Sequence, residues 1–314
     1  MHRVACLRTR LGDSVRAPFP RLDAFSMRPD LPLPAAYTIA ELRKIVADWR
    51  RDGLKVGFVP TMGALHAGHL ALVTQALERA DRVVVSIFVN PAQFAPGEDF
   101  EAYPRTLESD AQKLAGAGAH LAYAPNAAEM YPHGFATTVS LSGPADGLET
   151  EARPHFFAGV ATVVSKLFNQ VRPDLAVFGE KDYQQLLVIR RMTEDLDLGV
   201  EIVPGVTVRE ADGLALSSRN AYLSEADRKR AAALNVILAD FAQALETGAD
   251  AATAQAAALS AAQDAFDAVD YVEARCAQTL ERLAAGPIDR PVRVLAAVKV
   301  GSTRLIDNRP ANPR

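Results

Sequence analysis

Apolar residues follow two alternating patterns along most of the chain. In residues 39–49 they recur at helical spacing behind Thr38, whose side chain can cap a helix. Residues 55–60 and 82–89 are instead short apolar runs, and the second run is strongly β-branched, as is typical of a strand buried on both faces. Residues 70–80 return to helical spacing between the two runs. This part of the chain is therefore predicted to form a βαβ unit.

The same alternation continues to about residue 206. The apolar pattern predicts helices at 107–117, 157–170 and 183–195, and strands at 119–123, 174–178 and 199–203. A series of alternating strands and helices favours the α/β fold class. We therefore expect residues 36–206 to form a Rossmann-like, doubly wound parallel sheet.

The pattern changes beyond residue 206. A polar segment rich in Gly, Ser and Asn precedes predicted helices at 225–246 and 250–268 and predicted strands near 271–276, 292–299 and 304–308. We interpret residues 207–314 as a second, smaller α+β domain at the C-terminal end. Two domains agree with a length of 314 residues, since single cores stop growing near about 250–300 residues.

The first 35 residues differ in composition from the rest. They hold six arginines, three aspartates and five prolines but neither lysine nor glutamate, so they carry a charge of +3 and the remainder carries −7. The prolines argue against a long helix. Three interpretations stay open: a disordered N-terminal extension, which we favour, an organelle-targeting segment, or a stretch upstream of a true start at Met27.

Composition limits the classes of function. The net charge of −4 gives no general reason to bind nucleic acid, and no run approaches the about 18 apolar residues of a membrane span. Two cysteines, Cys6 and Cys276, exclude a disulfide framework and suit a reducing compartment, so we expect a cytoplasmic protein. Any binding site for an anion must therefore be built from a few local groups.

The segment PTMGALHAGH, residues 60–69, follows the first long strand and leads into a helix. Ligands of open α/β sheets bind at such strand ends, and the N–H groups of a helix start favour phosphate. His66 and His69 lie three residues apart, so they share a face and can reach one anion. The alternatives for this pair are a metal site or two ordinary polar caps.

Three further segments place polar side chains near predicted strand ends or at the start of the second domain. SIFVNPAQF holds Asn90 and Gln93, and FGEKDYQQL holds Lys181 and Gln185. Uncharged amides suit a substrate with hydroxyl and carboxylate groups. Lys181 and Arg219, the latter in the segment LSSR, are the candidate counter-charges for a triphosphate. Taken singly, each of these residues would be read as a loop cap or a solvated charge.

Together the four segments, in content and order, resemble the pantothenate synthetases, a family of the nucleotidyltransferase superfamily with an HxGH signature. The resemblance extends from about residue 39 to 308. It implies an ATP-dependent carbon–nitrogen ligase that joins (R)-pantoate to β-alanine through a pantoyl adenylate and releases AMP and diphosphate. Such a reaction needs no nucleophilic side chain, and the sequence contains neither a Cys/His arrangement nor a serine-nucleophile elbow.

The resemblance also implies the site residues. It makes His66, His69, Lys181 and Arg219 catalytic. It assigns Gln93 and Gln185 to pantoate, and Gln93 also helps to position β-alanine. Asn90 is a further candidate for substrate binding. The resemblance assigns ATP to Met62, Gly63, Ala64, Leu65, His66, Ala67, Gly68, His69, Gly179, Glu180, Lys181, Asp182, Val208, Leu216, Ser217, Ser218 and Arg219. Mg²⁺ is expected with ATP, and Asp99, Asp110 and Asp182 are the available carboxylates. The family further implies a homodimer. Because the histidines belong to the first domain and residues 217–219 open the second, we expect the active site in the cleft between the two domains.

Two alternatives remain at the level of the sequence. One is another nucleotidyltransferase of the HxGH type, which would act on a phosphorylated acceptor and need more basic residues than Gln93 and Gln185 supply. The other is a nucleotide-binding protein without catalysis, or a dinucleotide-binding domain. The turn reads GALHAGH where a dinucleotide fingerprint would have GxGxxG, which disfavours the last of these.

Overall fold

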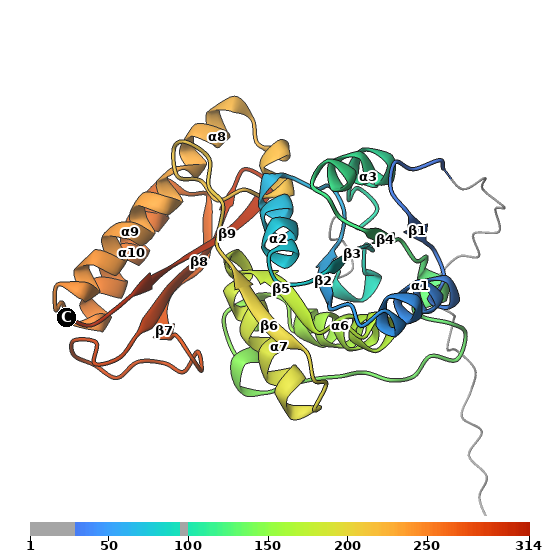
Figure 1. Cartoon of the computed structure of the whole chain (residues 1–314). Coiled ribbons are helices and arrows are strands. Elements are labelled where there is room, and N and C mark those ends of the chain that lie inside the picture. Colours follow the sequence, from blue (N-terminus) through green and yellow to red (C-terminus); the bar gives the residue numbers. More distant parts are fainter. Residues whose placement is uncertain (1–28, 95–99) are drawn as a thin grey trace, which may run out of the picture.

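The computed structural model describes residues 29–94 and 100–314, which form two lobes (Figure 1). A six-stranded, fully parallel sheet has the order β1-β4-β3-β2-β5-β6, and a three-stranded antiparallel sheet has the order β7-β8-β9. The predicted fold class is confirmed. The N-terminal extension up to residue 28 lies outside the described residues, as does the candidate carboxylate Asp99.

The first lobe contains the parallel sheet and the helices that cover it. Its strands are β1 (Ala35–Ala36), β2 (Val56–Thr61), β3 (Arg82–Ile87), β4 (Leu121–Tyr123), β5 (Leu175–Gly179) and β6 (Glu201–Gly205). Its helices are α1 (Ile39–Arg51), α2 (Ala67–Leu77), α3 (Leu107–Gly116), α4 (Ala127–Met130), α5 (Glu149–Ala152), α6 (Phe156–Val171) and α7 (Tyr183–Asp195), with 3-10 turns η1 (Pro91–Gln93), η2 (Gly143–Ala145) and η3 (Glu180–Asp182).

Alternating side chains of the parallel strands enter two separate apolar cores. Phe58 and Val84 pack with α1, α6 and α7, whereas Val59, Val83 and Val85 pack with α2 and α3. Both faces of the sheet are therefore buried, which explains why its strands read as continuous apolar runs. The chain reverses its direction of growth at β2, between β3 and β5, and this is the switch point where ligands of such sheets bind.

The fold begins within the segment 1–35 that was predicted to be an extension. Ala35 and Ala36 form β1 and pair with β4, and Leu33 is buried against the core beside α2 and α3. A two-residue strand has no periodicity that a sequence pattern could reveal. Helix α2 also begins earlier than predicted, at Ala67, because His66 provides its N-cap.

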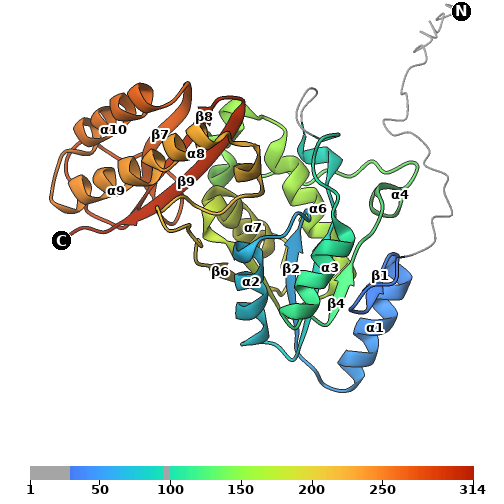
Figure 2. The ribbon, with the colours of Figure 1, turned by 90° about the horizontal axis from the view of Figure 1, so that it is seen from above.

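The second lobe comprises η4 (Ser218–Tyr222), α8 (Glu225–Ala231), α9 (Ala233–Glu246), α10 (Ala251–Ala265), β7 (Ala268–Cys276), β8 (Val292–Val300) and β9 (Thr303–Ala311). Helices α9 and α10 pack on the antiparallel sheet (Figure 2). The helix predicted over 225–246 is divided near Ala232. Arg228 ties α8 to Glu210 and Asp212, whereas α9 packs on the sheet.

A small apolar cluster joins the two lobes. It consists of Leu148 and Leu187 from the first lobe and Leu280 and Leu295 from the second. Leu148 and Leu280 adopt positive φ angles of 51° and 59°, a conformation that costs a branched side chain of order 1–3 kcal/mol and persists only when the surroundings impose it. The lobes therefore meet through a defined contact.

Candidate active site

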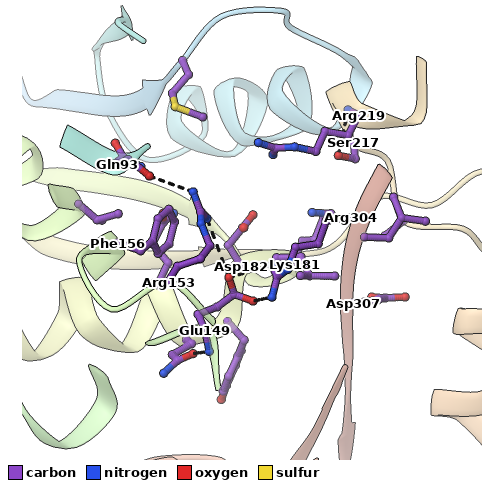
Figure 3. Close-up of a pocket in the computed structure, with 18 of the residues that line it drawn as sticks. Gln93, Glu149, Arg153, Phe156, Lys181, Asp182, Ser217, Arg219, Arg304 and Asp307 are labelled. Carbon is purple, nitrogen blue, oxygen red and sulfur yellow. Dashed lines mark hydrogen bonds and ion pairs between the residues drawn. The ribbon is translucent and has the colours of Figure 1, made fainter. Parts of the chain in front are cut away.

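A cavity of about 1060 Å³ lies between the lobes at the carboxyl ends of β2 and β5 (Figure 3). The first lobe lines it with Thr61, Met62, His69, Gln93, Glu149, Arg153, Lys181, Asp182 and Gln185, and the second with Ser217, Arg219, Arg304, Asp307 and Asn308. The cavity thus brings together residues from all four segments that the sequence singled out.

The histidine turn, residues 62–69, is held in place by a buried carboxylate. Asp110, on α3, is fully buried and accepts hydrogen bonds from the backbone N–H groups of Ala64 (2.9 Å) and Leu65 (2.8 Å) and from the hydroxyl of Thr106 (3.0 Å). The Nζ of Lys113 donates to the carbonyl of Leu65 (2.7 Å). Asp110 therefore shapes the turn, and its oxygens point at backbone rather than into the cavity.

His66 and His69 both accept backbone hydrogen bonds at Nδ1. The N–H of Gly68 donates to His66 (3.1 Å), the N–H of His66 donates to His69 (3.3 Å), and the two ring centroids lie 4.0 Å apart. An imidazole that accepts at Nδ1 carries its proton at Nε2 when it is neutral. Each ring therefore keeps one N–H donor available at Nε2.

Burial keeps both rings neutral. Burial, followed by the charges of Lys181 and Lys113, lowers the pKa of His66 to about 4. Burial, followed by His66 and Lys181, lowers the pKa of His69 to about 3. The turn consequently offers neutral donors at physiological pH, and the positive charge at this end of the cavity comes from Lys181 and Arg219.

Gln93 is held against helix α6. The amide of Asn90 donates to the Oε1 of Gln93 (2.8 Å) and to the carbonyl of Gly159 (3.1 Å), and the hydroxyl of Tyr131 donates to the Oδ1 of Asn90 (2.7 Å). Asn90 is 1% exposed and does not line the cavity, whereas Gln93 does. The structure therefore gives Asn90 a position behind Gln93.

The two adjacent glutamines of α7 have different surroundings. Gln184 is buried, donates to the carbonyls of Pro144 (3.0 Å) and Gly147 (3.2 Å), and accepts from the N–H of Glu149 (3.1 Å). Gln185 lines the cavity and is half-buried. Gln184 also borders the cavity, but its amide atoms are engaged by these backbone groups, which leaves Gln185 as the one available to a ligand.

Many of the other predicted residues lie around the cavity rather than in its lining. Among the described residues, Gly63, Ala64, Leu65, His66, Ala67, Gly68, Asn90, Gly179, Glu180, Val208, Leu216 and Ser218 are absent from that lining. Several have a visible structural task. Ala64 adopts a φ of 51° in the turn, and the N–H of Leu216 donates to the carbonyl of Val208 (3.0 Å).

A charged network crossing the cavity was not found from the sequence. Glu149 is 5% exposed and accepts from both Nη atoms of Arg304 (2.8 and 2.9 Å) and from the hydroxyl of Tyr271 (2.8 Å). Arg153 lies 4.0 Å from Glu149 and donates to the backbone carbonyl of Gln93 (2.9 Å; Figure 3). The residues of this network are up to 155 positions apart in the chain, so no local sequence pattern reveals the network.

The described residues lack two further features. No cluster of three or more His, Cys, Asp or Glu side chains could hold a metal ion there. Within the same residues, no helix has both the length and the apolar character needed to cross a bilayer.

A Rossmann-like sheet with an HxGH turn and a lysine at its switch point, covered by a second lobe, defines an α/β enzyme of the nucleotidyltransferase type. Comparison with known proteins narrows this class. The chain belongs to the pantoate–β-alanine ligase family, whose sequence model matches residues 35–310. The predicted family and enzyme class are confirmed, and the comparisons do not favour the alternative nucleotidyltransferase.

Individual relatives agree with this assignment. The pantothenate synthetase of Maricaulis maris is 64% identical over 281 residues, which cover 90% of this chain and 98% of the relative. That of Rhodospirillum rubrum is 54% identical over 277 residues, covering 88% and 98%.

Solved structures are similar over the same length. The pantothenate synthetase of Thermus thermophilus matches with a TM-score of 0.84 and 47% identity, over 90% of this chain and all of that one. The pantoate–β-alanine ligase of Francisella tularensis, described as complexed with beta-gamma ATP and β-alanine, matches with a TM-score of 0.73 and 33% identity, over 88% and 97%.

Proposed function

We propose that this protein condenses (R)-pantoate with β-alanine at the expense of ATP and forms pantothenate, AMP and diphosphate. The observation that carries the proposal is the composition of the cavity lining. The uncharged amides of Gln93 and Gln185 share the cavity with Lys181 and Arg219. Amides suit a hydroxy acid, and cations suit the triphosphate that activates it.

The reaction runs in two displacements. A carboxylate oxygen of pantoate attacks the α-phosphorus of ATP, the bond to the bridging oxygen breaks, and diphosphate leaves with the electron pair. The deprotonated amine of β-alanine then attacks the acyl carbon of pantoyl adenylate. The bond to the phosphate oxygen breaks and AMP leaves with the electron pair. The nitrogen loses one proton before the attack, as the ammonium group is deprotonated, and a second as the amide forms, and both go to solvent. All bond changes occur within the substrates.

The protein contributes alignment and electrostatic stabilisation. Alignment of the reactants can supply about 7–11 kcal/mol, and one preorganised donor to a developing anion about 2.7–4 kcal/mol. We assign the neutral Nε2–H donors of His66 and His69 to the phosphate oxygens, and the charges of Lys181 and Arg219 to the leaving diphosphate. Of the remaining predicted ATP residues, Met62, Asp182 and Ser217 line the cavity, and the others lie outside its lining.

We assign pantoate to Gln93 and Gln185. Gln93 projects from η1 after β3, and Gln185 from the first turn of α7 after β5, so their amides reach the cavity from two strand ends of the same sheet. Asn90 orients Gln93 from behind. This extends the sequence-based assignment of Asn90 by giving it an indirect role.

Mg²⁺ fits one of the predicted carboxylates. Asp182 lines the cavity next to Lys181, whereas both oxygens of Asp110 already accept hydrogen bonds from the histidine turn. Mg²⁺ usually keeps several waters and takes one or two carboxylates together with substrate phosphates, so a single aspartate is sufficient. We propose Asp182 as its protein ligand; when bound, the ion neutralises phosphate charge.

The experiment that tests the function is AMP release from ATP that depends on both pantoate and β-alanine. His69→Ala and Lys181→Ala should each lower kcat/KM by about 100-fold or more, because each removes a donor to developing charge. His133→Ala and Lys229→Ala remove the same side-chain types from exposed positions and should leave turnover unchanged. Near-normal turnover in both site variants would reject the assignment.

The family resemblance further supports a homodimer, and the two cysteines suit the reducing environment of the cytoplasm, so we include both in the proposal. Sedimentation equilibrium of the full chain measures the first directly. A monomer at micromolar concentration would contradict it.

A further inference from the structure

The turn that carries Lys181 is held by the second lobe. Asn308 lies on β9, opposite Leu295 of β8, and its Nδ2 donates to the carbonyls of Glu180 (2.9 Å) and Lys181 (2.8 Å). Asn308 is only 3% exposed. One buried amide group therefore joins β9 to two successive backbone carbonyls of η3.

A buried arginine fixes the orientation of this amide. The Nε of Arg293 donates to the Oδ1 of Asn308, so the oxygen must face Arg293 and the NH₂ group must face η3. The Arg293 guanidinium also stacks 4.2 Å from the ring centroid of Tyr183 and approaches Glu180 (3.5 Å). Arg293 thus contacts residues on both sides of Lys181, and it also orients the amide of Asn308 that binds the Lys181 backbone.

The strand that carries Asn308 is itself anchored. Arg209 donates to both carboxylate oxygens of Asp307 (2.6 and 2.9 Å) and to the carbonyl of Asn308 (3.3 Å). Asp307 is 3% exposed. Asn308 therefore contacts η3 from a strand that Arg209 anchors. A movement of β9 would displace the backbone at Lys181.

We propose that Asn308 is a positioning residue, which places the Lys181 ammonium group over the cavity. It acts through Lys181 because its own amide atoms are engaged by η3 and Arg293. Among the described residues the Lys181 ammonium group has no ion pair or hydrogen bond, so the turn that carries it is the support that the structure provides. The inference rests on the proposed function in that Lys181 binds phosphate.

The test is a double-mutant cycle between Asn308 and Lys181. Asn308→Ala should lower kcat/KM for ATP by about 10- to 100-fold, as expected when a catalytic group is displaced by about 1 Å, and should change KM for pantoate less than about twofold. In a Lys181→Ala background the same change should cost less than about threefold, because the group that Asn308 positions is gone.

The matched control is Asn235→Ala. Asn235 is a half-buried amide of the same lobe that accepts from Arg309 and does not line the cavity. It should lower the melting temperature as Asn308→Ala does, without the loss in kcat/KM for ATP. If Asn308→Ala does not fold, Asn308→Asp replaces it, since that variant keeps an acceptor for Arg293 and removes the donors to η3.

Two results would overturn the inference: normal kcat/KM for ATP in a folded Asn308 variant, or equal losses in the presence and absence of the Lys181 side chain. Calorimetric titration with ATP separates this outcome from failure of the proposed function. If the wild-type chain binds ATP but makes no pantothenate, the function fails, whereas a weaker ATP affinity in Asn308→Ala, absent in the Lys181→Ala background, still supports the positioning role.

Discussion

At the scale of single residues, the histidine turn fixes the protonation of its own side chains. Backbone N–H groups occupy the Nδ1 atoms of His66 and His69, and burial lowers the pKa of both rings well below their ordinary value. The result is a pair of N–H donors without charge. Such donors can stabilise a developing anion without an ammonium-like attraction to the ground-state phosphate.

These pKa values predict how stability depends on pH. Below about pH 6.5 the unfolded chain protonates both histidines while the folded chain does not, so stability falls as pH drops towards about 4 for His66 and about 3 for His69. The slope is at most about 1.4 kcal/mol per pH unit for each ring. His69→Gln should therefore lose less stability than the wild type between pH 7 and pH 5 in chemical denaturation.

His133→Gln is the control for this measurement, because His133 is exposed. It should retain the pH slope of the wild type. Parallel curves for the wild type and His69→Gln would contradict the neutral, buried state of His69.

The sequence predicted which residues have suitable chemistry for the site, but it did not predict which way their side chains point. A polar residue after a strand can face a ligand or a neighbour, and the pattern is the same in both cases. Asn90 turns to its neighbours because Tyr131 and Gly159, 41 and 69 residues away, complete its hydrogen bonds. Asp110 likewise has the chemistry of a magnesium ligand, but the N–H groups of Ala64 and Leu65 occupy its oxygens.

At the scale of elements, the close approach of α6 to η1 determines where Gln93 lies. A Cβ atom at Gly159 would fall 2.2 Å from the carbonyl oxygen of Ala92, so only glycine allows this packing. The carbonyl of Gly159 also accepts from Asn90. Helix α6 therefore acts as the support for the pantoate side of the proposed site.

Gly159→Ala should displace η1 and raise KM for pantoate by about 10-fold or more, while KM for ATP changes less than about threefold. Steady-state kinetics with each substrate varied in turn measures the difference. Gly116→Ala is the matched control, since a Cβ at this helical glycine meets no described atom within 4 Å. The control should be neutral or slightly stabilising, and equal changes in both KM values would refute the proposed support.

Elements with a long periodic pattern were predicted within a few residues, and short ones were missed. Helices α1, α6 and α7 carry several apolar turns, so their spacing is evident. Strand β1 has two residues, and its only support is pairing with β4, about 87 residues later in the chain. Such pairing belongs to the tertiary structure and leaves no local trace.

At the scale of the whole molecule, the two lobes are joined by charge as well as by the leucine cluster. Glu149 of the first lobe contacts Arg304 and Tyr271 of the second, and Arg304 also pairs with Asp270 (2.7 Å). Through Arg153 the same network reaches the backbone of Gln93. Relative motion of the lobes would therefore disturb the pantoate side of the proposed site.

Glu149→Gln should lower the free energy of unfolding by about 1–3 kcal/mol, because it leaves the half-buried guanidinium of Arg304 with a weaker partner. Denaturant titration measures this change. Glu151→Gln is the control: Glu151 is exposed and lies 3.6 Å from Arg282, also exposed, so its loss should change stability by less than about 0.5 kcal/mol. If the two substitutions lowered the free energy of unfolding equally, the network would not stabilise the contact between the lobes.

The order of the elements and the place of the cavity followed from the sequence, since strand ends at a switch point are predictable from element order. The contacts between the lobes did not. Several of them join residues more than 100 positions apart, such as Glu149 with Arg304 and Lys181 with Asn308, and they involve common residue types. Only the folded arrangement brings these residues into contact.

The contact between β9 and η3 also bears on the order in which a ribosome makes the chain. The parallel sheet and both histidines are synthesised before the second lobe, but Lys181 meets Asn308 only after 127 further residues have been added. A nascent chain can therefore complete its first lobe while the turn that carries Lys181 still lacks this support. The cavity between the lobes is therefore completed only when β9, the last strand to be made, has paired with β8.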